Sequence, residues 1–185
     1  MSKIIIPIIN WATVSYMLLA TAALSAPYAA LVIDAENGDV LHEENADTRL
    51  HPAGFTKLMS LYAAFEAIET GLIGLEDRAK ISLKAQSEPP VALGLREGQR
   101  VSTSVLLKAV GVQGANDAST ALAEAIDGSE AAFARRMNSH SKELGLTRST
   151  WKNAHGLTEK GHLMGARYSH IRTSGYYETN HGASQ

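Results

Sequence analysis

The segment from Thr56 to Thr70 constrains the fold of this chain more than any other segment. Its large apolar residues recur at spacings of three and four, which is the pattern of a helix with one buried face. Gly71 follows at the position of a helix C-terminal cap. Because the apolar face needs a sheet to cover it, we predict a helix buried inside a domain. The residues of this face are Leu58, Leu61, Tyr62, Phe65, Ile68 and Leu72.

A β-hairpin is predicted before this helix. The apolar run from Ala29 to Asp34 is typical of a strand, and Val40 to Glu44 suits its partner. Asn37-Gly38 between them is the signal of a two-residue hairpin turn. We therefore expect the mature chain to begin with two antiparallel strands.

Three more helices are predicted after it. Residues 74–98 carry two adjacent prolines and glycine-bounded turns, so we expect a connection with short elements at most. Serine, asparagine or aspartate can cap each of the helices that follow, and glycine can end two of them. The expected bounds are Ser102 or Ser104 to about Val112, Asn116 or Asp117 to Gly128, and Ser129 to Gly145.

Length and composition narrow the class of protein. A chain of 185 residues suits one domain with a real core. Its 17 basic and 19 acidic residues are nearly balanced and form no long block, which argues against nucleic-acid binding. Without cysteine, the chain has no disulfide and no thiolate metal site.

The N-terminus predicts export. Lys3 precedes an apolar run to Leu24, and the small residues Ala23 and Ser25 suit a cleavage site. We expect residues 1–25 to be a signal peptide, with an uncleaved membrane anchor as the alternative. Either reading places the rest of the chain outside the cytoplasm, as a periplasmic or extracellular protein. Residues 169–185 show no periodicity and are expected to be a frayed tail.

A resemblance to a known family begins at His51. The run HPAGFTKLMSLYAAFEAIETG is similar to the active-site helix of the D-alanyl-D-alanine carboxypeptidases, low-molecular-mass penicillin-binding proteins in which P-A-S-x-T-K opens that helix. Later segments, GANDASTALAEAIDGSEAAFARRMN and NAHGL among them, also resemble the family in order and spacing. The resemblance covers about Pro27 to Arg167.

The resemblance implies an α/β fold, that of the serine β-lactamases and penicillin-binding proteins, with a sheet packed against helices. Residues 26–168 would form a partial domain of this D-Ala-D-Ala-peptidase kind. We expect only its N-terminal portion, with the C-terminal sheet strands of the family missing.

The chemistry of that family needs three elements at one cleft. In S-x-x-K, a serine at a helix N-terminus is activated by a lysine one turn later. In S-x-N, a second serine relays a proton and the asparagine amide holds the substrate. In K-T-G, a late strand carries a cation for the substrate carboxylate.

This chain departs from that pattern at both serines. The first element reads G-F-T-K, so Lys57 keeps the general-base position while Gly54 stands at the nucleophile position. The second reads G-A-N, with Gly114 in place of the relay serine and Asn116 kept. No K-T-G follows in this sequence. The resemblance therefore implies an inactive site.

By resemblance, the function is that of a serine-type D-Ala-D-Ala carboxypeptidase of peptidoglycan metabolism, a hydrolase without metal or organic cofactor. The partners implied are peptidoglycan stem peptides, with β-lactams bound at most non-covalently. Missing strands would leave an open edge on the first strand, which predicts loose packing or self-association. Two alternatives stay open: a non-catalytic remnant that binds peptidoglycan peptides, and a truncated product without stable function.

Several residues also have ordinary interpretations. Lys57 alone would suit a surface lysine, and Asn116 suits a helix N-cap as well as a ligand. S-x-x-K recurs at Ser139 and Ser149, but neither begins a buried helix after a hairpin, so we expect no displaced nucleophile. The histidines show no metal-ligand spacing. Those expected to be solvated or in loops are His155, His162, His170 and His181.

Overall fold

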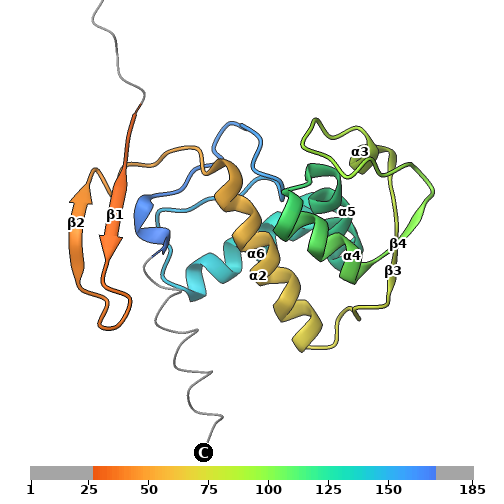
Figure 1. Cartoon of the computed structure of the whole chain (residues 1–185), viewed down its shortest axis with the longest axis horizontal. Coiled ribbons are helices and arrows are strands. Elements are labelled where there is room, and N and C mark those ends of the chain that lie inside the picture. Colours follow the sequence, from red (N-terminus) through yellow and green to blue (C-terminus); the bar gives the residue numbers. More distant parts are fainter. Residues whose placement is uncertain (1–26, 170–185) are drawn as a thin grey trace, which may run out of the picture.

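The computed structural model describes residues 27–169. They form an elongated body with a hairpin at one end, a second pair of strands at the other, and helices between (Figure 1). The predicted signal peptide, residues 1–25, and all but the first residue of the predicted tail lie outside the described residues. Within residues 27–169, no helix is both long and apolar enough to cross a membrane.

The predicted hairpin is confirmed, but its predicted turn is wrong. Strands β1 (Ala30–Ile33) and β2 (Val40–Glu44) pair antiparallel, and the last pair joins Ile33 to Val40. The connection is therefore longer than two residues. The carboxylate of Asp34 accepts the Glu36 N–H at 2.8 Å. A side-chain hydrogen bond therefore stabilises this longer loop, in place of the two-residue turn expected at Asn37-Gly38.

The central helix is also confirmed, but its predicted apolar face is only partly covered: Leu61, Tyr62 and Ile68 are half-buried against the core. Helix α2 (Thr56–Glu69) follows the short 3-10 helix η1 (Ala53–Phe55). Leu58 and Phe65 are 52% and 57% exposed, because the described part of the chain places no element over them. Small residues fill the buried face and allow neighbouring helices to approach closely. The buried residues are Thr56, Met59, Ser60, Ala63, Ala64 and Ala67.

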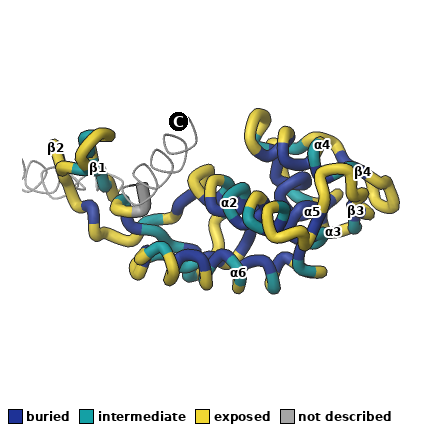
Figure 2. Tube along the Cα trace, turned by 90° about the horizontal axis from the view of Figure 1, so that it is seen from below, coloured by how far each residue is buried: buried dark blue, intermediate teal, exposed yellow. Residues whose placement is uncertain are grey.

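Helix α5 (Asn116–Asp127) is the centre of the helical part. It packs against α2, α3, α4 and α6, and most of its residues are buried (Figure 2). Strands β3 (Arg78–Lys80) and β4 (Arg100–Ser102) form a second antiparallel pair beside it. The remaining elements are α3 (Leu83–Gln86), α4 (Thr103–Lys108), η2 (Ala109–Gln113), α6 (Glu130–Glu143) and η3 (Ala166–Ser169).

The ends of these helices follow the predicted caps in most cases. Ser102 stands at the N-cap of α4, and the Ser129 hydroxyl accepts a backbone N–H from the first turn of α6. Gly128 ends α5 with a φ of +74°. The helix predicted to reach Val112 ends as an α-helix at Lys108 and continues as one π-helical turn, η2. This turn brings the chain to the candidate site.

Candidate functional site

Lys57 lies in the first turn of α2, where two acceptors hold its amine. Its Nζ donates to Asn116 Oδ1 at 2.7 Å and to the carbonyl of His155 at 2.5 Å. The side chain is half-buried, and this desolvation lowers the pKa of Lys57 from the ordinary lysine value. The Lys57 amine is therefore held in one orientation by two hydrogen bonds and is less basic than an ordinary lysine.

Gly54 lies in η1, just ahead of α2, and faces open space. A Cβ added to Gly54 would meet no atom within 4 Å. Gly54 and Lys57 both line a cavity of about 380 Å³ whose other walls are mainly apolar. The remaining lining residues are Leu58, Leu61, Val91, Val110, Gly111, Val112, Gln113 and Gly114.

Gly114 belongs to the same cavity and ends η2. Its φ is +72°, a backbone conformation in which a side chain is strained even though a Cβ would meet nothing within 4 Å. The four residues singled out by sequence thus come together. Gly54, Lys57 and Gly114 line the cavity, and Asn116 joins them through Lys57.

Asn116 is not the N-cap of α5, so that alternative is wrong. Ala115 is the N-cap, and Asn116 is the first residue of the helix. The Asn116 side chain does not cap the helix. Its Nδ2 donates instead to the Pro89 carbonyl at 2.8 Å. Its backbone N–H donates to the Val91 carbonyl at 2.7 Å. These bonds tie the start of α5 to the loop that carries Val91 into the cavity wall.

Asp117 reinforces the same loop and was missed by sequence reasoning. Its carboxylate is 1% exposed and accepts backbone N–H groups of Leu93, Gly94 and Leu95 at 2.8 to 2.9 Å. From the sequence, an acid in the first turn of a helix indicates no more than a favourable charge near the helix N-terminus. Its loop partners lie more than twenty positions earlier, so no local pattern announces them.

The cavity offers the Lys57 amine and apolar walls but no hydroxyl in place of the missing serine. None of the described residues that line it carries a hydroxyl, thiol or carboxylate. Two hydroxyls of α2 are buried and engaged elsewhere: Thr56 Oγ1 lies 2.8 Å from His162 Nε2, and Ser60 Oγ donates to the Ala154 carbonyl. Ser139 is exposed on α6, where it bonds Glu143. Among the described residues, the site can hold a ligand but has no group placed to form an ester with it.

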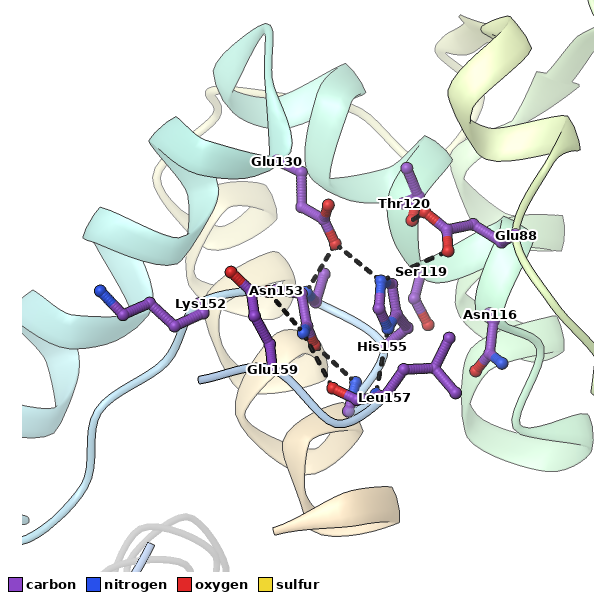
Figure 3. A network of polar contacts seen from close by, with 12 residues as sticks. Glu88, Asn116, Ser119, Thr120, Glu130, Lys152, Asn153, His155, Leu157 and Glu159 are labelled. Carbon is purple, nitrogen blue, oxygen red and sulfur yellow. Dashed lines mark hydrogen bonds and ion pairs between the residues drawn. The ribbon is translucent and has the colours of Figure 1, made fainter. Parts of the chain in front are cut away.

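His155 and His162 lie in loops, as one of the two expectations has it, but neither is solvated. His155 is 8% exposed and His162 is fully buried, while His170 and His181 lie outside the described residues. The His155 ring faces Glu88 and Glu130, and one ligand atom from each of the three lies within 4.8 Å of the others (Figure 3). No sequence pattern predicts this cluster, because Glu88, Glu130 and His155 belong to three separate segments of the chain.

Comparisons with known proteins agree on one family. The family model described as D-alanyl-D-alanine carboxypeptidase matches residues 18–173. D-alanyl-D-alanine carboxypeptidase DacF of Bacillus subtilis is 39% identical over 137 residues, which are 74% of this chain and 35% of the relative. DacC of Escherichia coli is 37% identical over 143 residues, 74% of this chain and 36% of the relative. The chain thus spans about a third of the length of these curated relatives.

Solved structures show the same likeness. The D-alanyl-D-alanine carboxypeptidase DacD of Francisella tularensis superposes with a TM-score of 0.76 at 30% identity, covering 96% of this chain and 40% of that one. Penicillin-Binding Protein D2 of Listeria monocytogenes in an ampicillin-bound form gives a TM-score of 0.69 at 27% identity, covering 83% and 62%.

Proposed function

Because the chain belongs to the D-alanyl-D-alanine carboxypeptidase family, with the α/β fold of its penicillin-binding proteins, we propose that it is a non-catalytic member that binds peptidoglycan stem peptides. It acts in cell-wall metabolism, outside the cytoplasm, where such peptides occur. The D-Ala-D-Ala end of the peptide occupies the cavity between Gly54 and Gly114. Lys57 supplies the charged contact, and Asn116 holds the Lys57 amine in place.

One observation carries this proposal: the contact between Lys57 and Asn116 persists beside a cavity whose nucleophile position is Gly54. Loss of a nucleophile alone removes about six orders of magnitude in turnover in a serine hydrolase. Loss of the relay hydroxyl at Gly114 acts on the same catalytic unit. The apolar walls and the fixed amine remain available for binding.

Calorimetric titration with an N-acetylated L-Lys-D-Ala-D-Ala peptide tests the proposal. We expect saturable binding, and no free D-Ala after long incubation. A peptide that ends in L-Ala-L-Ala is the ligand control, because it presents the same charge with the opposite handedness. Release of D-Ala at an ordinary enzymatic rate, roughly one per second or more, would refute the non-catalytic part.

Matched lysine variants test the location. Lys57→Met removes the ammonium and keeps the length of the side chain, so binding should weaken by at least about tenfold, the value of one good charged contact. Lys108→Met removes an exposed lysine at the end of α4, outside the cavity lining, and should leave binding unchanged. Equal affinity of the two variants would place the peptide elsewhere.

A further inference from the structure

The side chain of His155 lies between two buried carboxylates. Its Nε2 is 3.4 Å from Glu88 Oε2 and 3.4 Å from Glu130 Oε1 (Figure 3). The three side chains are 8%, 9% and 5% exposed, respectively. Groups this buried need fixed partners, because unpaired charges cost several kcal/mol away from water.

A backbone hydrogen bond fixes which ring nitrogen of His155 carries the proton. The Leu157 N–H donates to Nδ1 at 3.1 Å, so the proton of the neutral ring is on Nε2 and points at the carboxylates. Burial lowers the pKa of His155 and favours this neutral form. A metal ion on Nε2 would move the ring proton to Nδ1, against the Leu157 N–H. The ring is therefore arranged as a hydrogen-bond donor rather than as a metal ligand.

Both carboxylates are themselves held in place. Glu130 Oε1 accepts the Ala154 N–H at 2.8 Å, and its Oε2 pairs with Lys84 Nζ at 2.5 Å. Glu88 Oε1 accepts the Thr120 hydroxyl at 2.9 Å. The cluster thus fixes the backbone at Ala154 directly, and the neighbouring His155 through its ring.

The other side of the same backbone segment faces α2. The carbonyl of His155 accepts from Lys57, and the carbonyl of Ala154 accepts from Ser60 at 2.7 Å. At Gly156, an added Cβ would stand 1.9 Å from the Ala53 carbonyl oxygen, so the segment touches η1 without a side chain between them. Residues 154–156 are held between the carboxylate cluster and the start of α2.

We propose that Glu130, Glu88 and His155 are positioning residues for Lys57. The cluster fixes the His155 carbonyl, and this carbonyl fixes the Lys57 amine beside Asn116. None of the three lines the cavity, so they act on a ligand only through Lys57. The use of this arrangement rests on the proposed function, whereas the arrangement itself can be tested without any ligand.

Competitive acetylation followed by peptide mass spectrometry reads out Lys57 directly. The reagent labels each lysine according to its own pKa and accessibility, so the profile against pH gives both for Lys57. In the unaltered protein, we expect Lys57 to titrate below the exposed lysines of the chain. In Glu130→Gln the His155 carbonyl loses its support and the amine becomes solvated, so its apparent pKa should rise toward the ordinary lysine value.

Glu143→Gln is the matched control, because Glu143 lies on the same helix, is 64% exposed and contacts His140 rather than residues 154–156. Only variants with an unchanged near-UV circular dichroism spectrum are compared. Glu88→Gln serves if Glu130→Gln does not fold, because Glu88 bonds no backbone group of the segment. An unchanged Lys57 profile in a folded Glu130 or Glu88 variant would overturn the proposal. Failure of the peptide titration would leave this result standing.

Discussion

The Nζ atom of Lys57 lies 2.7 Å from the Oδ1 atom of Asn116, although 59 positions separate the two residues. The bond joins the first turn of α2 to the first residue of α5 at the edge of the cavity. Asn116 also holds the Pro89 carbonyl, so one amide connects two helices and a loop. Removal of the Asn116 amide should therefore lower the stability of the fold as well as the affinity for a ligand.

Asn116→Ala should lower the free energy of unfolding by about 1–3 kcal/mol, because it leaves the Pro89 carbonyl and the half-buried Lys57 amine short of partners. Urea unfolding measures this loss. Gln113→Ala, on the exposed rim of the same cavity, removes one long contact to the Ala92 carbonyl and should cost less than about 0.5 kcal/mol. Similar losses for the two variants would show that the Asn116 bonds do not support the fold.

Two glycines of the site should respond in opposite ways to an added side chain. Gly54→Ala enters open space and should change the free energy of unfolding by less than about 0.5 kcal/mol. Gly156→Ala places its Cβ 1.9 Å from the Ala53 oxygen at a φ of +88°, and should cost more than about 3 kcal/mol. Thermal unfolding of both variants side by side checks this. A mild Gly156→Ala would contradict the close packing of residues 154–156 on η1.

We predict that the fold loses stability in mild acid because His162 becomes protonated. Burial lowers the pKa of His162 to about 4, and its Nδ1 accepts the Lys152 N–H, a bond that protonation breaks. The unfolded chain therefore binds the proton first. The stabilisation is complete above about pH 6.5 and declines as the pH falls toward 4, by up to about 3 kcal/mol. Urea unfolding across this range should show the decline, and a flatter profile in His162→Gln.

The hairpin predicts self-association. Among the described residues, β1 pairs only with β2, and Val32, Val40 and Leu41 are 49%, 46% and 66% exposed. Open, apolar strand edges recruit further strands. Light scattering after size exclusion should detect dimers or larger species, and Val32→Lys should shift them toward monomer. A monomeric, unaltered chain with a sharp near-UV spectrum and one cooperative thermal transition would contradict this prediction and the alternative of a product without stable function.

The sequence predicts where helices and strands lie more accurately than it predicts which of their faces are buried. The spacing of Leu58 and Phe65 predicts a helix because periodicity is local, but whether a face is covered depends on elements far along the chain. The buried face is built from residues such as Ala63 and Ala67, which a search for large apolar residues passes over. The hairpin turn was misplaced because the Asp34 side chain closes a longer loop.

The same limit applies to the site. Lys57 and Asn116 were identified by resemblance to family motifs, and the structure brings them into contact. The partners behind them were not identified. Glu130 follows a helix cap and resembles any first-turn acid, while His155 lies in a loop without metal-ligand spacing. Their meeting depends on the packing of α6 against the loop after Trp151, which no local pattern encodes.

The central claim is that the cavity binds a ligand but forms no acyl ester with it, because Gly54 carries no hydroxyl. Intact-mass spectrometry after incubation with ampicillin tests it most directly, with Penicillin-Binding Protein D2 of Listeria monocytogenes, solved in an ampicillin-bound form, as the reference. We predict that the mass of this chain stays unchanged at ampicillin concentrations that modify the reference. A stoichiometric mass increment that maps to Ser60, Ser139 or any other residue would contradict the account.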